Sequence, residues 1–229
     1  MPIAGDEADP APLAHPRYAK KVHIDGVSDA GKLNDYLYRG TQPSEKGLKH
    51  LRRLGIDTIV DLRGEFHGQM ESERRHAAKL GMRLISIPGN GWSPPKDEQV
   101  AQFFALIDEQ PRHKIYVHCW LGGDRSGVFL AAYRIAFDGW TPDEAIAEMN
   151  RFHFHGFWHP AMKRYIHDFP ARLRRSPVLA RYHHAETAAS LSPDSVHARS
   201  RVDLHVPAGM LSCRRRETRA PQYASFKEN

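Results

Sequence analysis

The sequence predicts an α/β domain whose central, mostly parallel sheet is flanked by helices. Three observations support this prediction. Short apolar runs rich in β-branched residues occur at 57–63, 82–88 and 114–118, and they have the length of buried strands. Between them lie segments with apolar residues every three or four positions, which is the period of an amphipathic helix. The strands alternate with the helices, and this order indicates a layered architecture with parallel strands.

The first half of the domain contains two helices and two strands. Ser44 is a suitable N-cap for a helix that ends at Gly55. One side of this helix carries three leucines: Leu48, Leu51 and Leu54. The strand 57–63 (DTIVDLR) follows. The charged segment 71–80 then predicts a surface helix before the strand 82–88 (MRLISIP).

The second half contains the third strand and the remaining helices. Apolar residues at positions i, i+3, i+4 and i+7 predict a helix: Val100, Phe103, Phe104 and Ile107. The strand 114–118 (KIYVH) then enters a glycine-containing loop, 119–126, which opens another helix. The segment 141–144 (TPDE) is a capping box with proline at the first helical position, and its helix runs to Met149. The last predicted helix covers 160–169.

Composition divides the chain into three parts. Residues 1–20 are rich in proline, alanine and charge and predict a flexible lead-in, 21–172 form the predicted domain, and 173–229 form a basic, disordered tail. Lys and Arg number 11 in residues 171–229 against 5 Asp and Glu, whereas the first 170 residues hold 22 of each. The net charge of +6 therefore belongs to the tail, and we expect no folded basic face for nucleic acid.

The sequence also predicts a cellular compartment. No apolar run approaches the ~18 residues that a membrane span needs, so we expect no membrane span. Residues 1–7 show neither the basic nor the apolar region of a secretory signal. Cys119 and Cys213 occur in unrelated contexts and do not suggest a disulfide framework. We expect a cytoplasmic protein with a free reactive thiol, because thiols stay reduced there.

The segment 116–127 (YVHCWLGGDRSG) carries the chemistry. A cysteine at the end of a strand is followed, after five residues, by an arginine that opens a helix. Backbone N–H groups of such a loop can turn inward and bind an anion, and Gly122 and Gly123 relax the limits on its backbone. The same dipoles favour the thiolate of Cys119, which can attack phosphorus while Arg125 binds two phosphate oxygens. The pattern predicts a phosphate-monoester site rather than a buried structural cysteine.

This segment resembles the HCxxGxxR(S/T)G signature of the protein tyrosine/dual-specificity phosphatase superfamily. Two further segments are similar to its bacterial dual-specificity-like members: 37–43 (LYRGTQP) and 55–63 (GIDTIVDLR). The resemblance covers about residues 20–170 and implies the cysteine-phosphatase fold. It also implies that Cys119 is the nucleophile and that Arg125 clamps the phosphate.

The resemblance implies roles for the neighbouring residues as well. Ser126 would assist the second step, in which water releases phosphate from the sulfur. Six residues would form the phosphate cradle: Trp120, Leu121, Gly122, Gly123, Asp124 and Arg125. No metal and no cofactor is implied.

The donor of the proton to the leaving oxygen stays open between two aspartates. Relatives usually carry this acid on a loop before the cysteine, here 87–92, which contains Asn90 and no aspartate. Asp97 lies 22 residues before the cysteine and could equally be a first-turn helix residue. Asp124 lies within the loop, as in some lipid-directed relatives, and could instead pair with a cation.

Four more side chains are candidates for supporting roles. The His118 ring is expected to bind backbone and fix the cysteine loop. Arg63 and Glu65 follow a strand end, where α/β sites gather, so they either border the pocket or pair in solvent. Trp92 either forms a wall of the cleft or lies exposed on a loop.

The histidine-rich run 153–159 (HFHGFWH) suggests a metal site at first sight. Its spacing is loose, and no acidic or cysteine ligand lies within it. We therefore expect a loop that packs its aromatic residues near the base of the domain, without metal.

The sequence favours hydrolysis of phosphotyrosine and/or phosphoserine/threonine in protein, or of another small phosphoester. The loop has no Lys, His or Arg before Arg125, whereas a polyphosphorylated inositol would favour extra cations there. Asp124 nevertheless keeps a phosphoinositide or inositol phosphate as the alternative substrate. A rhodanese-like sulfurtransferase is disfavoured because its loop is usually one residue shorter. A non-catalytic phosphate-binding module is disfavoured because such relatives lose the nucleophile.

Overall fold

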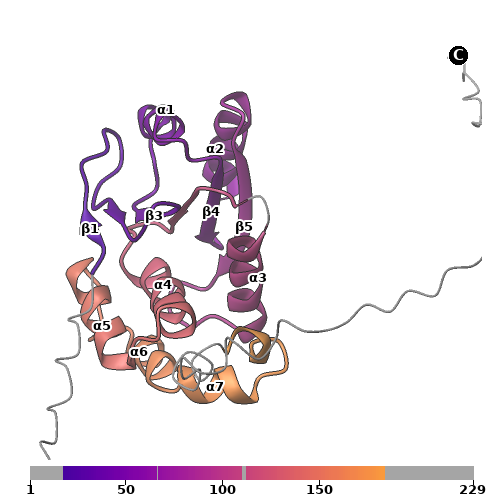
Figure 1. Cartoon of the computed structure of the whole chain (residues 1–229). Helices are drawn as coiled ribbons and strands as arrows, with labels where there is room; N and C mark the ends of the chain where they lie inside the picture. The colour runs from indigo at the N-terminus through magenta and orange to yellow at the C-terminus, as the bar shows by residue number, and fades with distance from the viewer. Residues whose placement is uncertain (1–17, 66, 110–111, 184–229) are drawn as a thin grey trace, which may run out of the picture. The chain divides into compact units, whose positions relative to one another are not determined.

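Figure 1 shows the computed structural model, which describes residues 18–65, 67–109 and 112–183. By its internal contacts the chain divides into residues 1–190 and 191–229, and every described residue belongs to the first part. Ala19 and Tyr182, near the two ends of the described chain, are both buried. The packing therefore continues past both ends of the predicted domain, 21–172. The predicted tail beyond residue 183 lies outside the described residues.

The described residues form a six-stranded sheet in the order β1-β2-β3-β6-β4-β5. Its strands are β1 Lys20–Lys21, β2 Gly31–Lys32, β3 Leu37–Gly40, β4 Thr58–Arg63, β5 Arg83–Gly89 and β6 Ile115–His118. Strands β3, β6, β4 and β5 pair in parallel, and only the two-residue strands β1 and β2 introduce antiparallel pairs. The predicted α/β class with a mostly parallel sheet is confirmed.

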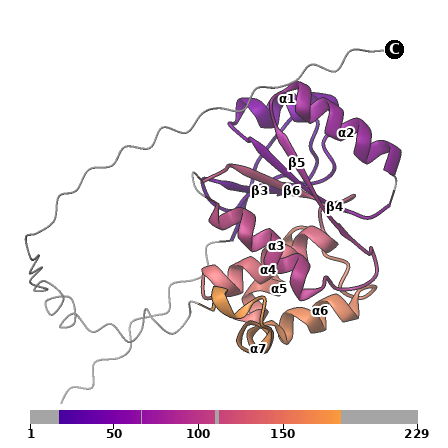
Figure 2. The same cartoon turned by 90° about the vertical axis from the view of Figure 1, so that its right-hand side faces the viewer.

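Helices cover both faces of this sheet (Figures 1 and 2). The helices are α1 Glu45–Arg53, α2 His67–Lys79, α3 Asp97–Asp108, α4 Asp124–Phe137, α5 Pro142–Arg151, α6 Pro160–His167 and α7 Phe169–Arg175, followed by the 3₁₀ turn η1 Ala180–Tyr182. Both views place α1 and α2 on one side and α3 to α7 on the other. Ile59 and Val60 of β4 belong to different core clusters, because successive strand residues point to opposite faces. The sheet is therefore buried on both sides.

Local signals in the sequence explain where several helices begin. The Ser44 hydroxyl accepts a hydrogen bond from the Gly47 N–H, as its predicted role as N-cap requires. The Thr141 hydroxyl and the Glu144 side chain form the predicted capping box of α5. The prediction that Leu54 belongs to the apolar side of α1 is wrong. The helix ends at Arg53, and Leu54 is its C-cap and is 42% exposed.

The predicted last helix, 160–169, is two helices. Helix α6 ends at His167, and α7 begins at Phe169. Pro170 explains the break, because it has no N–H to donate to the Ile166 carbonyl and its ring would crowd that carbonyl in a continuous helix. The second helix carries Phe169 and Leu173 into the core.

No helix within the described residues combines the length and apolar character that a bilayer crossing needs.

The sheet brings three strand ends together where the motif lies. His118, the last residue of β6, is the register partner of Gly40 in β3 and of Asp61 in β4. The carboxyl ends of these parallel strands therefore meet at one edge, which is where α/β folds place their sites.

Candidate active site

The Cys119 loop, residues 119–123, joins the end of β6 to the start of α4. Its backbone requires glycine at one position, because Gly122 has φ +78° and a Cβ there would come within 2.5 Å of the Gly40 carbonyl. At Gly123 a Cβ would lie 2.5 Å from the His153 carbonyl oxygen. The loop is therefore held between the end of β3 and the loop after α5, with no room for side chains at either glycine.

Cys119 faces a cavity of about 880 Å³. The cavity is lined by residues 64–65 after β4, by residues 88–92 around the end of β5, and by parts of the Cys119 loop and first turn of α4. Cys119 itself is only 3% exposed, whereas Trp92 is 71% exposed and Leu121 55% exposed. The thiol thus lies at the bottom of a cavity with an apolar rim, and Trp92 both lines the cavity and reaches solvent.

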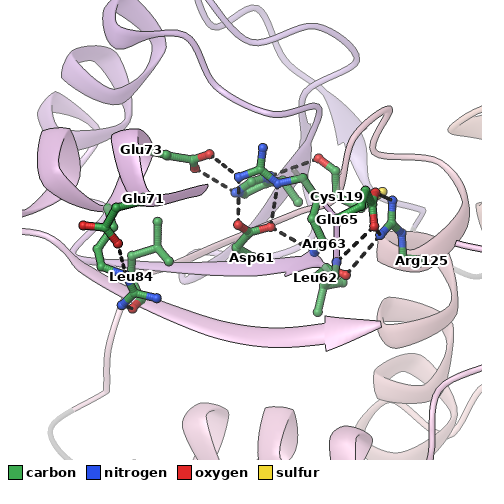
Figure 3. Close-up of polar contacts among 12 residues, drawn as sticks. Asp61, Leu62, Arg63, Glu65, Glu71, Glu73, Leu84, Cys119 and Arg125 are labelled. Atoms are coloured by element: carbon green, nitrogen blue, oxygen red, sulfur yellow. Dashed lines mark hydrogen bonds and ion pairs between the residues drawn. The ribbon is translucent and has the colours of Figure 1, made fainter. Parts of the chain in front are cut away.

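Arg125 lies in the same cavity and is held in place by Glu65 (Figure 3). Its Nη1 and Nη2 donate to the two carboxylate oxygens of Glu65 at 2.8 and 2.6 Å. Nη1 also donates to the carbonyl oxygens of Leu62 and Gly89 at 3.4 and 3.3 Å. These hydrogen bonds use the two terminal nitrogens, so the Nε edge of the guanidinium stays available to an oxyanion.

The electrostatic state of Arg125 follows from these contacts. Burial would lower the pKa of Arg125, but the hydrogen bond that it donates to Glu65 and the charge of Cys119 raise it overall. Arg125 in turn lowers the pKa of Glu65 through the same hydrogen bond. The guanidinium is thus a permanent cation next to the thiol.

Arg63 neither borders the pocket nor pairs with Glu65 in solvent, which were the two positions expected from the sequence. It is fully buried between Asp61 and Glu73, with Nη2 2.7 Å from each carboxylate (Figure 3). Glu73 also lies 2.9 Å from Nε2 of His118, whose Nδ1 donates to the Cys119 carbonyl at 3.0 Å. A chain of buried charges thus links helix α2 to the cysteine, and the predicted support of the loop by the His118 ring is confirmed.

The surroundings of His118 favour its protonated form. Nδ1 donates to a carbonyl oxygen, and Nε2 lies at ion-pair distance from Glu73, although the angle between these two groups does not make a hydrogen bond. Burial alone would lower the pKa of His118, but the charge of Glu73 raises it overall. Asp61, Glu73 and His118 could also gather ligand atoms around a metal ion. Arg63 already donates to both carboxylates, so we assign this cluster to structural support.

We predict that Glu73→Gln makes stability less dependent on pH. Because the pKa of His118 is raised in the folded state, its contribution to the free energy of unfolding is present below about pH 6.5 and is lost as the pH rises through the folded-state pKa. Removing the Glu73 charge should cost about 1–3 kcal/mol near pH 6 and less at alkaline pH. Urea unfolding across this range measures the difference.

The matched control is Glu71→Gln on the same helix, where the carboxylate is 55% exposed and pairs with surface arginines. It should leave the pH profile unchanged. Equal destabilisation by Glu73→Gln at all pH values would contradict a charged His118.

Asp124 lines the cavity and binds the histidine-rich run. Its carboxylate accepts from the His155 backbone N–H at 2.8 Å and lies 3.2 Å from the ring Nδ1 of the same residue. His159, which also lines the cavity, places Nε2 3.7 Å from Asp124 and its ring 5.2 Å from that of Trp92. The expected loop is present, but it lies beside the cavity and not at the base of the domain. Phe157 is 86% exposed and is not packed inside.

Asp97 lies apart from these residues. Its carboxylate accepts from the Tyr165 hydroxyl at 3.1 Å and from Arg172 at 3.2 Å, and it is not among the residues that line the cavity. It is the first residue of α3, which agrees with the alternative reading of a first-turn helix residue.

Ser126 is fully buried in the first turn of α4. Its hydroxyl has no hydrogen-bond partner among the described residues. A buried hydroxyl without a partner is costly, so this donor is available for a group that appears during a reaction.

Three neighbours of the Cys119 loop were not assigned to the site from the sequence. Arg39 donates to the Gly122 carbonyl, Glu73 lies beside His118, and His159 borders the cavity. Arg39 lies in the segment 37–43 that resembles known phosphatases, and His159 ends the histidine-rich run 153–159. Glu73 carried no signal and reaches the site through tertiary packing.

Known proteins resemble this chain in sequence. It is 26% identical over 144 residues to the dual specificity protein phosphatase TpbA of Pseudomonas aeruginosa, a match that covers 63% of this chain and 62% of that protein. It is 31% identical over 139 residues to the probable chloroplastic NAD kinase 2 of Oryza sativa, which covers 59% of this chain and 14% of the relative. The chain thus spans less than two thirds of the length of these curated relatives.

A solved structure resembles this fold as well. The crystal structure of P. aeruginosa TpbA in complex with pTyr superposes with a TM-score of 0.59 at 20% identity, covering 75% of this chain and 99% of that one. At this identity the likeness shows the fold, which is the cysteine-phosphatase fold that the resemblance implied. Residues 13–159, well over half of the chain, match the family model described as DSP-PTPase phosphatase fused to NAD+ kinase, and the protein therefore belongs to this family.

Proposed function

We propose that the protein hydrolyses phosphate monoesters of phosphotyrosine and/or phosphoserine/threonine in proteins, through a phosphocysteine at Cys119. The thiolate attacks phosphorus, the bond to the ester oxygen breaks, and that oxygen takes a proton from an acid. Water then gives a proton back to the same acid and attacks phosphorus, the sulfur leaves as thiolate, and inorganic phosphate is released. Arg125 binds the phosphoryl oxygens in both steps, and the Ser126 hydroxyl stabilises the departing sulfur.

One observation carries the proposal: Cys119 and Arg125 line the same cavity, at the junction of a strand and a helix N-terminus. A sulfur anion and a fixed guanidinium around one hollow are suited to a tetrahedral dianion. The relatives point the same way, because TpbA is named a dual specificity protein phosphatase.

The charges of the cavity favour a singly phosphorylated substrate. Arg125 is the one arginine or lysine among the described residues that line it, beside the imidazole of His159, and two carboxylates, Glu65 and Asp124, line it too. A polyphosphorylated ring would meet these carboxylates, whereas the apolar rim suits a phosphorylated side chain. A phosphoinositide or inositol phosphate therefore stays the alternative substrate.

A substrate panel tests the proposal. Phosphopeptides, p-nitrophenyl phosphate, phosphoinositides and inositol phosphates should be compared as substrates, together with thiosulfate plus cyanide. We expect turnover of the first two groups. Transfer of sulfur to cyanide would support a sulfurtransferase instead, and phosphate binding without turnover of any ester would support a non-catalytic module.

We propose Asp124 as the acid that protonates the leaving oxygen. It lines the cavity with Cys119, whereas Asp97 binds Tyr165 and Arg172 elsewhere. Asp124→Asn should lower kcat for alkyl phosphates about 10²–10⁴-fold and remove the basic limb of the pH profile. The loss should be far smaller for p-nitrophenyl phosphate, because p-nitrophenolate leaves without a proton.

Asp97→Asn is the matched comparison and should change neither the pH profile nor the dependence on the leaving group. Thermal unfolding of both variants separates chemistry from the loss of the His155 contact. If Asp97→Asn shows the leaving-group effect and Asp124→Asn does not, the assignment is reversed.

We further propose that residues 21–172, together with the packed residues at both ends, form the catalytic domain. A cytoplasmic location suits the mechanism, because a nucleophilic thiolate needs a reducing compartment.

A further inference from the structure

Arg39 lies directly behind the Cys119 loop. It belongs to β3, which pairs in parallel with β6, and its side chain is among the largest fully buried ones. Its Nη2 donates to the Gly122 carbonyl oxygen at 2.7 Å. The guanidinium also lies 4.2 Å from the centre of the Phe152 ring.

Its charge is balanced differently from those of the other buried arginines. Arg63, Arg125 and Arg134 each hold at least one carboxylate as an ion pair. Arg39 forms no such pair with any described residue, and its Nε has no hydrogen-bond partner among them. A buried cation without a carboxylate in contact is strongly disfavoured, so a negative charge nearby is expected to compensate it.

The Cys119 sulfur is one of three negative charges that act on Arg39, after Glu148 and Asp29. Burial lowers the pKa of Arg39 to about 10, while the charges of Glu148, Asp29 and Cys119 oppose that shift. Arg39 thus stays charged at neutral pH. Both carboxylates already serve other groups, because Glu148 binds Arg134 and Asp29 binds Lys21.

The segment that carries Arg39 also sets the direction of the loop's peptide groups. The Trp120 carbonyl accepts from the Gln42 N–H at 3.2 Å, and the Gly122 carbonyl accepts from Arg39. In a trans peptide the N–H points opposite to the C=O. Both carbonyls are turned toward β3 and the residues that follow it, so the N–H groups of Leu121 and Gly123 point away from this segment, as an anion cradle requires.

We infer that Arg39 is a positioning residue of the phosphatase reaction, which holds the Gly122 carbonyl out of the phosphate cradle and stabilises the Cys119 thiolate from behind. The inference rests on the proposed function. The buried guanidinium of Arg39 orients the Gly123 N–H and also supplies part of the positive potential at the Cys119 sulfur.

Three substitutions separate the two effects. Arg39→Gln keeps a donor for the Gly122 carbonyl and removes the charge, Arg39→Lys keeps the charge with a single ammonium, and Arg39→Met removes both. Two measurements need no turnover: the pH dependence of Cys119 alkylation by iodoacetamide, and the affinity for inorganic phosphate. A third measurement is kcat/KM with p-nitrophenyl phosphate.

Arg39→Met should slow alkylation near pH 6 about tenfold and lower kcat/KM about 10–100-fold, as expected for loss of a charge-assisted hydrogen bond. Arg39→Lys should keep the wild-type pH profile of alkylation but bind phosphate more weakly. Arg39→Gln should bind phosphate better than Arg39→Met while sharing its slow alkylation at low pH.

Leu51→Ala controls for general destabilisation, since Leu51 is fully buried in the core cluster on the side of α1 and α2. It should lower Tm and leave the alkylation profile and phosphate affinity unchanged. The inference fails if Arg39→Met behaves like Leu51→Ala. If Arg39→Met does not fold, the contrast between Arg39→Lys and Arg39→Gln decides. Should wild type hydrolyse no ester while these shifts appear, the proposed function fails and the role of Arg39 stands.

Discussion

Cys119→Ser should lower phosphatase kcat by at least about a thousandfold, as deletions of catalytic nucleophiles do. A serine hydroxyl stays protonated at neutral pH, so the anion that attacks phosphorus is lost while the shape of the loop is kept. Steady-state kinetics with p-nitrophenyl phosphate and a phosphotyrosine peptide measure the effect.

The control for this variant is binding. The backbone N–H groups of the loop and Arg125 are untouched, so phosphopeptide affinity and Tm should remain close to the wild-type values. Turnover that persists in Cys119→Ser would remove the sulfur from the mechanism. Lost binding together with a lowered Tm would instead show that the variant is misfolded.

Arg125→Lys should lower kcat/KM about a thousandfold, the lower end of what a transition-state arginine contributes to phosphoryl transfer. Lysine keeps the charge but offers one compact ammonium in place of a planar pair of donors. It cannot hold both oxygens of Glu65, as Arg125 does, and bind an oxyanion with another edge. Kinetics on the same two substrates measure the loss.

Glu65→Gln is the matched comparison, because it keeps the guanidinium and removes only the charge that orients it. We expect a loss of about tenfold, near the value of one charge-assisted hydrogen bond. If Arg125→Lys retained most of the activity, a simple positive charge would be enough, and bidentate phosphate binding would be wrong.

Sequence patterns predicted the fold and the centre of the site because both are encoded locally. The apolar runs of β4, β5 and β6 are short and continuous, as expected for strands covered on both faces, and Ser44 and Thr141 mark helix starts through their own backbone contacts. Cys119 and Arg125 are close together in the sequence, so the loop between them is enough to bring both to one site.

Residues that reach the loop from distant elements could not be placed in this way. Arg39 and Gly122 are 83 positions apart and meet only because β3 pairs with β6. Glu73 reaches His118 from a helix that shows no apolar signal for its inner face. The position predicted for the run 153–159, near the base of the domain, is wrong, because the sequence does not determine which part of the domain this loop lies against.

The phosphocysteine itself is the most direct test of the central claim. Wild-type protein is mixed with excess p-nitrophenyl phosphate, quenched in acid within milliseconds, digested and analysed by mass spectrometry. The comparison set is Cys119→Ser and Ser126→Ala, because loss of the Ser126 hydroxyl should slow the release of phosphate from the sulfur. We predict a phosphoryl group on the peptide that carries Cys119, more of it in Ser126→Ala and none in Cys119→Ser. Rapid turnover with an unmodified Cys119 peptide in both wild type and Ser126→Ala would contradict the account.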